Sequence, residues 1–479
     1  MKRLIAVLAG AFLSVTLASG GLVAADKTKA APTFNADVAP ILYRSCAGCH
    51  RPNQIAPMSL LSYQDARPWA KAIRTKVHAR QMPPWFADPR FGKFANDKSL
   101  TQAEIDTIVA WADAGAPQGT GSAPPLPKFS EAGWSHPSGR DPDLVIELPL
   151  DWKVAAEGEM PNFNLYSPIP FKEAKLVEAI QVRAGNIAAT HHITLAAQNL
   201  PPGMTLGTGP AWPGGPITSN VLVAAEKGAQ VDNSGDATEA DAADEDDGGG
   251  ASIGAYIPGA SARVARPGVA KWIRGDRYKY IRWNLHYQAT GRPETARPSI
   301  GIWWQTSDVS NVERGSRFEN QTSEGKPLIA PANASRLRLN QLLSPIPPND
   351  GSWTATGIAA IQDDVTVLGF GVHMHLRGRE MTYVATYPDG HQEVLLRVPK
   401  YNFEWQLPYE LEKPVKLPAG STVKAIAVYD NSTDNRMNPA PNKEVYWSEQ
   451  SWDDMFLPSI RYTLDKLEAK PRTTTQGQP

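Results

Sequence analysis

The chain has 479 residues, and at ~150 residues per domain this length corresponds to about three domains. Its formal net charge of -1 gives no general attraction to nucleic acid or to an anionic membrane surface, so both classes of partner are disfavoured. Only two cysteines are present, which excludes a framework of disulfides as the source of stability.

The first 25 residues have the pattern of a secretory signal peptide. Lys2 and Arg3 supply positive charge, residues 4–17 form an apolar run, and residues 23–25 resemble a cleavage site. The sequence therefore predicts an exported protein, either periplasmic or secreted. The alternative is that the apolar run is retained as a membrane anchor. No later segment is apolar enough to span a bilayer.

Residues 32–117 are expected to form a small helical domain. In the first helix, Val38, Ile41 and Leu42 share one face, and Asn35 is the expected N-cap. A second helix is expected to begin at a capping box made by Thr101 and Glu104 and to end at Gly115. The apolar stripe of this second helix contains Ile105, Ile108, Val109 and Ala112.

The segment Cys46-Ala47-Gly48-Cys49-His50 has the spacing of a c-type haem attachment site. In such a site two thiols add to the haem vinyl groups, and the adjacent histidine becomes an axial iron ligand. A dithiol redox motif or half of a zinc site would use the same residues. Neither a βαβ pattern nor a second pair of cysteines supports those alternatives. We therefore expect one covalent haem c, bound outside the cytoplasmic membrane.

The second axial ligand is expected to be Met82, in the proline-stiffened loop of residues 80–85. Met58 is too near His50 to cross easily to the other haem face, and His78 would give a bis-histidine haem. Residues 32–117 resemble a class I cytochrome c domain of the kind fused to other modules in environmental bacteria. Residues 46–50, Pro57, Met82 and the closing helix carry this resemblance.

A linker is expected at residues 118–140, which are rich in Gly, Ser and Pro. From Asp141 onward, short apolar and aromatic runs separated by turn residues predict an all-β region. Residues 226–250 are acidic and Gly-rich and are expected to be a disordered loop. The polar tail at residues 466–479 is assigned no structure.

Histidines gather in three places of this β region: His191-His192, His286, and the pair His373 and His375. Side chains two apart on a strand point the same way, so His373 and His375 can chelate one metal ion. Adjacent histidines point to opposite faces, so His191 and His192 share a metal only where the strand is distorted or lies at an edge. Imidazoles alone do not choose among copper, zinc, iron and nickel.

The order of these clusters, followed by Asp453-Asp454-Met455, resembles the copper type II, ascorbate-dependent monooxygenases, the family of peptidylglycine and dopamine hydroxylases. The resemblance covers roughly residues 141–464 and implies two jelly-roll-like β-sandwich domains, expected at 141–298 and 299–465. It implies one copper on each side of a solvent-filled cleft. The implied ligands are His191, His192 and His286 for an electron-transfer copper, and His373, His375 and Met455 for an oxygen-activating copper. Met437 is the rival methionine.

Two departures from this family limit what the resemblance implies. Peptide-hydroxylating members carry an arginine two residues before the H-x-H, where this chain has Gly371, so a peptide-glycine substrate is disfavoured. The eukaryotic members contain disulfides, whereas the β region of this chain has no cysteine.

The expected architecture is thus a small all-α cytochrome c domain followed by two all-β sandwich domains. The domain order suggests a monooxygenase that hydroxylates an organic substrate with dioxygen. Its electrons would come from a periplasmic donor through the haem, which replaces ascorbate. One alternative is a non-catalytic haem and copper electron carrier. Another is a haem protein whose β-sandwiches serve only as a structural binding module.

Overall fold

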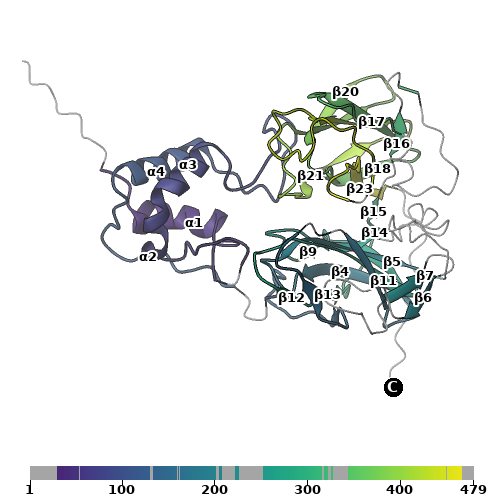
Figure 1. Ribbon diagram of the computed structural model, residues 1–479, viewed down its shortest axis with the longest axis horizontal. Coiled ribbons are helices and arrows are strands. Elements are labelled where there is room, and N and C mark those ends of the chain that lie inside the picture. Colours follow the sequence, from purple (N-terminus) through teal and green to yellow (C-terminus); the bar gives the residue numbers. More distant parts are fainter. Residues whose placement is uncertain are drawn as a thin grey trace, which may run out of the picture.

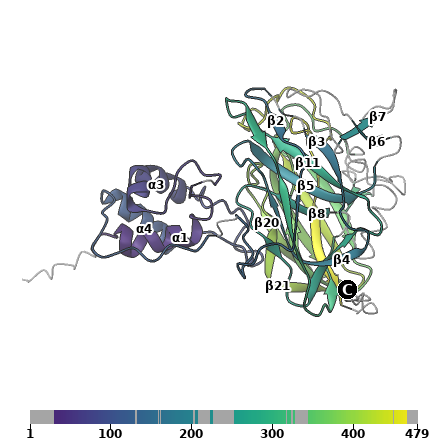
Figure 2. The same ribbon diagram turned by 90° about the horizontal axis from the view of Figure 1, so that it is seen from below.

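The computed structural model describes residues 30–465, except 53, 130–132, 159, 161, 201–203, 208–221, 226–251, 316–317, 322–324, 327–342 and 449. The protein is mostly β, with a helical part at one end of its long axis and two β units beside each other (Figures 1 and 2). The expectations for residues 1–25, 226–250 and 466–479 lie outside the described residues. Within the described part of the chain, no helix is sufficiently long and apolar to be a candidate membrane span.

The helical part contains short helices around a core of its own. They are η1 (Phe34–Val38), α1 (Ala39–Ser45), α2 (Tyr63–Ala66), η2 (Arg67–Trp69), α3 (Ala70–His78) and α4 (Gln102–Asp113). Phe34, Leu42, Ile108 and Trp111 are buried in this core. The predicted capping box of α4 is confirmed, and Gly115 follows the helix with a positive φ.

The expected cap at Asn35 is wrong. The first helix begins after Thr33, which makes no side-chain capping bond. The buried Asn35 amide instead donates a 2.6 Å hydrogen bond to the carbonyl of Gly121. This bond holds the start of the linker against the helical part.

The first β unit is a sandwich of two sheets. One sheet has the order β1-β13-β4-β10-β14, with β9 paired to β4; the other has the order β3-β11-β5-β8. A buried apolar core that includes Leu165, Ile193, Trp283 and Ile300 lies between them. The strands are β1 (Leu144–Glu147), β2 (Trp152–Val154), β3 (Phe163–Pro168), β4 (Ala174–Arg183), β5 (Thr190–Gln198), β6 (Met204–Gly207), β7 (Leu222–Ala225), β8 (Ser252–Tyr256), β9 (Arg263–Val264), β10 (Val269–Arg274), β11 (Tyr280–Tyr287), β12 (Glu294–Ala296), β13 (Ser299–Trp304) and β14 (Asn311–Val312).

The second β unit is also built from two sheets, with the orders β15-β23-β18-β21 and β16-β17-β22-β19-β20. Its strands are β15 (Arg314–Gly315), β16 (Glu319–Gln321), β17 (Trp353–Ala360), β18 (Val365–Gly371), β19 (Gly378–Thr386), β20 (Gln392–Val398), β21 (Tyr409–Leu417), β22 (Thr422–Tyr429) and β23 (Ser459–Leu464). The expected boundary at residue 299 needs correction, because β13 pairs with β1 and β4 of the first unit. The change of unit follows β14.

Residues 85–97 leave the helical part and pack on the second β unit, although they lie within the range expected for the helical domain. Phe94 is buried in the core of that unit, with its ring 5.6 Å from the ring of Tyr409. Backbone hydrogen bonds join Asp88 to Arg397 and Ala95 to Glu410. This segment, which has no helix or strand of its own, therefore ties the helical part to the second β unit.

The two β units meet through a network of charged side chains. Glu313, 7% exposed, forms ion pairs with Arg263 of β9 and with Arg461 of β23. Glu410 of β21 pairs with the same two arginines. Burial opposes ionisation of Glu313, but the charges of Arg263, Arg461 and Lys271 outweigh this effect and lower its pKa to about 2. The network therefore stays charged across the interface.

Candidate metal centre

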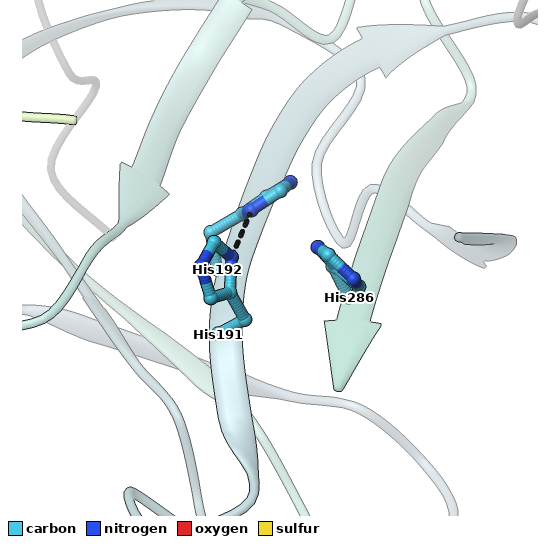
Figure 3. Close-up of side chains that lie close together, drawn as sticks. All are labelled: His191, His192 and His286. Carbon is cyan, nitrogen blue, oxygen red and sulfur yellow. Dashed lines mark hydrogen bonds between the residues drawn. The ribbon is translucent and has the colours of Figure 1, made fainter. Parts of the chain in front are cut away.

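Three histidines of the first β unit point toward one another (Figure 3). His191 and His192 lie on β5, and His286 lies on the neighbouring strand β11. The register of this strand pair shifts at this point: His286 faces His192, whereas Tyr287 faces Thr190, so His191 is the extra residue of a β-bulge. A bulge re-aims side chains, which is why two adjacent histidines gather on one side of the strand. One ligand atom from each of the three rings lies within 4.8 Å of the others.

His373 and His375 also come together, but not on a strand as their spacing predicts. β18 ends at Gly371, and both histidines lie in the irregular segment that follows. Their ring centroids are 5.2 Å apart. Met374, between them, is completely buried in the core of the second unit. Successive side chains therefore still alternate in direction after β18 has ended, as they do on a strand.

The two histidine groups adjoin each other across the boundary of the β units. The ring centroids of His192 and His373 are 6.4 Å apart. Phe403, from the segment between β20 and β21, stacks on His191 at 4.6 Å and lies 5.7 Å from His375. The solvent-filled cleft implied by the family resemblance does not separate these rings. Instead, one aromatic side chain contacts both groups in a largely buried cluster.

Burial favours the neutral form of four of these imidazoles. It lowers the pKa of His286 to about 3 and that of His373 to about 4, with a further lowering from neighbouring histidines. The pKa values of His192 and His375 are lowered well below the usual range for the same reasons. A neutral imidazole has a free lone pair, so these four rings are in the protonation state that binds metal ions.

Hydrogen bonds orient the second group of rings. Nδ1 of His373 donates to Oε1 of Gln406, and Nδ1 of His375 is 3.3 Å from the carbonyl oxygen of Asp453. Histidine ligands of metals usually donate their other ring N–H to such a carbonyl or carboxyl oxygen. Gln406 and Phe403 were not predicted from the sequence, because neither belongs to a motif or to a periodic pattern.

The carboxylate of Asp454 links Met455 to the H-x-H segment. This carboxylate accepts hydrogen bonds from the backbone N–H groups of His375 and Met455, both at 2.8 Å. Asp454 is completely buried, and burial raises its pKa to about 7. Met455 is 8% exposed, whereas the rival Met437 is 48% exposed. The buried position favours Met455 as the methionine of this group.

The Cys46–His50 segment follows α1 and holds both thiols unpaired. Nδ1 of His50 is 3.2 Å from the carbonyl oxygen of Met58, so donation there leaves Nε2 for a ligand. Burial lowers the pKa of His50, which favours the neutral ring. Met82 is half-buried in the loop after α3, and His78 is exposed at the end of that helix.

The comparisons with known proteins do not identify a family. No family model matches the chain, and no curated protein matches it. Matches among solved structures are distant. They include PNGF-II (8% identity, TM-score 0.25), a Paenibacillus xanthan lyase (8%, 0.15) and the C-terminal globular domain of an oligosaccharyltransferase from Pyrococcus abyssi (9%, 0.12). In the same order, the matches cover 67%, 75% and 67% of this chain. This chain spans 65%, 29% and 53% of the matched chains, which is less than two thirds of each.

Proposed function

We propose that the protein is an exported, copper-dependent monooxygenase that receives electrons through its own c-type haem. In this proposal the helical part is a cytochrome c domain, and the two β units are jelly-roll-like domains of the peptidylglycine and dopamine hydroxylase type. The reaction would consume dioxygen, two electrons and two protons, and yield a hydroxylated substrate and water. When bound, copper supplies one-electron chemistry toward dioxygen, and the haem supplies the electrons.

The donor set supports copper in both groups. His191, His192 and His286 offer three ring nitrogens within 4.8 Å of one another, and His373 and His375 offer two more. The buried Met455, whose N–H shares the Asp454 acceptor with the N–H of His375, would add a soft thioether. Nδ1 of His286 is buried and has no hydrogen-bond partner among the described residues, which is the state expected of a metal ligand. Thioether and imidazole together favour copper, and the thioether favours the cuprous state.

The residues of the Cys46–His50 segment also fit a covalently bound haem. Cys46 and Cys49 are free to form thioether bonds, and the Met58 carbonyl fixes the ring of His50 with Nε2 available. We propose Met82 as the second protein ligand of the haem. His50 and Met82 would hold the iron, and a histidine–methionine ligand pair would raise its reduction potential.

The surroundings of Gly371 restrict the substrate. A Cβ atom at this position would lie 2.4 Å from the hydroxyl oxygen of Ser459. An arginine here would displace the Ser459 side chain, and the glycine present offers no group for a substrate carboxylate where peptide-hydroxylating members have their arginine. We propose a substrate without a C-terminal glycine carboxylate.

The observation that carries this proposal is the meeting of five histidines from both β units in one cluster, four of them buried. The direct experiment measures oxygen uptake and product by mass spectrometry, with the haem- and copper-loaded protein, a reductant and a panel of organic substrates. Incorporation of one atom of labelled dioxygen into a product supports the proposal. Rapid haem oxidation with copper bound but no labelled product would instead identify an electron carrier.

The matched control for this assay is the His373→Ala, His375→Ala double variant. It keeps the haem segment and the histidines of the first unit, and is expected to lose the labelled product. A haem-loaded chain that binds no stoichiometric copper would leave the β units as a structural module.

A further inference from the structure

The haem-attachment segment lies against the first β unit at Gly259. A Cβ atom at Gly259 would lie 3.0 Å from Sγ of Cys49. Gly259 has a φ of +79° in the turn after β8, where the N–H of Ala260 bonds to the carbonyl of Ile257. The backbone conformation therefore favours glycine here, and a larger side chain would press on Cys49.

From this contact the chain leads directly to the first histidine group. Tyr256 is the last residue of β8 and pairs with Ile193 of β5, the residue next to His192. Tyr256 is buried, and its pKa is raised by burial and, in addition, by the neighbouring Cys49. A thiol that forms part of the haem site thus lies near a strand that is hydrogen-bonded to the ligand strand.

Other contacts hold the helical part in this position. The guanidinium of Arg51, next to His50, lies 4.2 Å from the ring centroid of Phe129 in the linker. On the other side, residues 85–97 are bonded to the second β unit. The helical part is therefore attached to both β units, with Cys49 facing the first.

We propose that Gly259 and Tyr256 form an intramolecular docking site for the Cys46–His50 segment, and that electrons enter the first β unit there. This inference rests on the proposed function and assigns its electron route. In each transfer one electron would pass from the haem held by Cys46, Cys49 and His50 to the copper ion held by His191, His192 and His286, so that ferrous iron is oxidised as cupric copper is reduced, and no bond would form or break. Covalent and hydrogen bonds from Tyr256 through Ile193 to His192 carry the electron better than a gap would.

The docking geometry is tested with the full-length chain produced without haem, which needs neither metal. A Cβ-to-sulfur distance of ~3 Å is what a disulfide requires between one Cβ and the far sulfur. We therefore expect Gly259→Cys to form a disulfide with Cys49, detected by peptide mapping under non-reducing conditions. The matched control is Gly291→Cys, because Gly291 also has a positive φ, +83°, and a Cβ there would meet no atom within 4 Å. Absence of the Gly259→Cys crosslink in a chain with the circular dichroism of the control would overturn the docking site.

The haem- and copper-loaded protein gives a second readout that does not depend on that crosslink. After anaerobic reduction of the haem by a flash, we expect a fast phase of haem reoxidation coupled to loss of the cupric electron paramagnetic resonance signal. Gly259→Val should lose this fast phase while keeping the haem spectrum and the copper content, and Gly291→Val should retain it. An unchanged fast phase in Gly259→Val would overturn the electron route. Loss of product formation with the fast phase intact would contradict only the proposed function.

Discussion

Replacing Glu313 with glutamine is predicted to destabilise the contact between the two β units. Glu313 lies in the connection between the units and is 7% exposed. Oε2 of Glu313 contacts the guanidinium of Arg263 on one side and that of Arg461, at 3.3 Å, on the other. A neutral amide would leave these two arginines with only Glu410 as a shared counter-charge.

The expected loss can be estimated in two ways. Removing one partner of a buried ion pair costs about 3–5 kcal/mol, and the remaining Glu410 places this case near the lower end. The pKa of Glu313 falls from 4.5 to about 2. At about 1.4 kcal/mol per pKa unit, this shift also corresponds to roughly 3 kcal/mol. Because the folded pKa is the lower one, this stability is present above pH 4.5 and is lost as the pH falls toward 2.

Urea unfolding of the full chain, followed by tryptophan fluorescence, measures this loss. We expect Glu313→Gln to reduce the free energy of unfolding by about 3 kcal/mol at pH 7, and the difference from the wild type to shrink as the pH falls below 4.5. The control is Glu173→Gln, which breaks a 3.0 Å pair with Lys175 at 58% side-chain exposure. This control should change stability by less than about 1 kcal/mol. Equal effects of the two variants would refute the reasoning.

Three further predictions concern other parts of the structure. Burial lowers the pKa of Lys271 from 10.5 to about 8. Between these pH values the unfolded chain binds a proton that the folded chain does not, so the free energy of unfolding of the wild type should rise with pH. Lys271→Met should abolish this rise in urea titrations. Asp454→Ala removes the acceptor of the His375 N–H and should weaken one of two copper-binding events about 10–100-fold in calorimetric titration, whereas Asp434→Ala should not. Phe94→Ala should lower the free energy of unfolding by about 3–5 kcal/mol in thermal unfolding. It should also detach residues 85–97 from the second β unit, which faster amide exchange there would show. Unchanged exchange would contradict this packing.

Much of the candidate site could be predicted from residue identity alone. The spacing of Cys46, Cys49 and His50 and the three histidine clusters are local signals, and the structure brings the histidines into one cluster. The requirement for a distorted strand at His191 and His192 is also met, by the β-bulge opposite His286. Local chemistry restricts such residues strongly, because a metal ligand needs a particular donor atom wherever the chain leads.

The contacts between distant segments could not be predicted in the same way. Residues 85–97 have no period that separates them from an ordinary loop, yet they pack in the core of the second β unit. Gln406 and Phe403 approach the histidines only through the path of the chain between β20 and β21. The boundary after β14 depends on the pairing of β13 with β1 and β4, which is a tertiary choice. A sequence pattern indicates which residues are buried and whether they form a helix or a strand. It does not indicate which other segment packs against them.

The most direct test of the central claim is the iron and copper content of protein matured in a periplasm that attaches haem. We predict a ratio of about one iron to two copper ions per chain, with His286→Ala and His375→Ala each losing one copper and no iron. One iron without copper in the wild type would contradict the account.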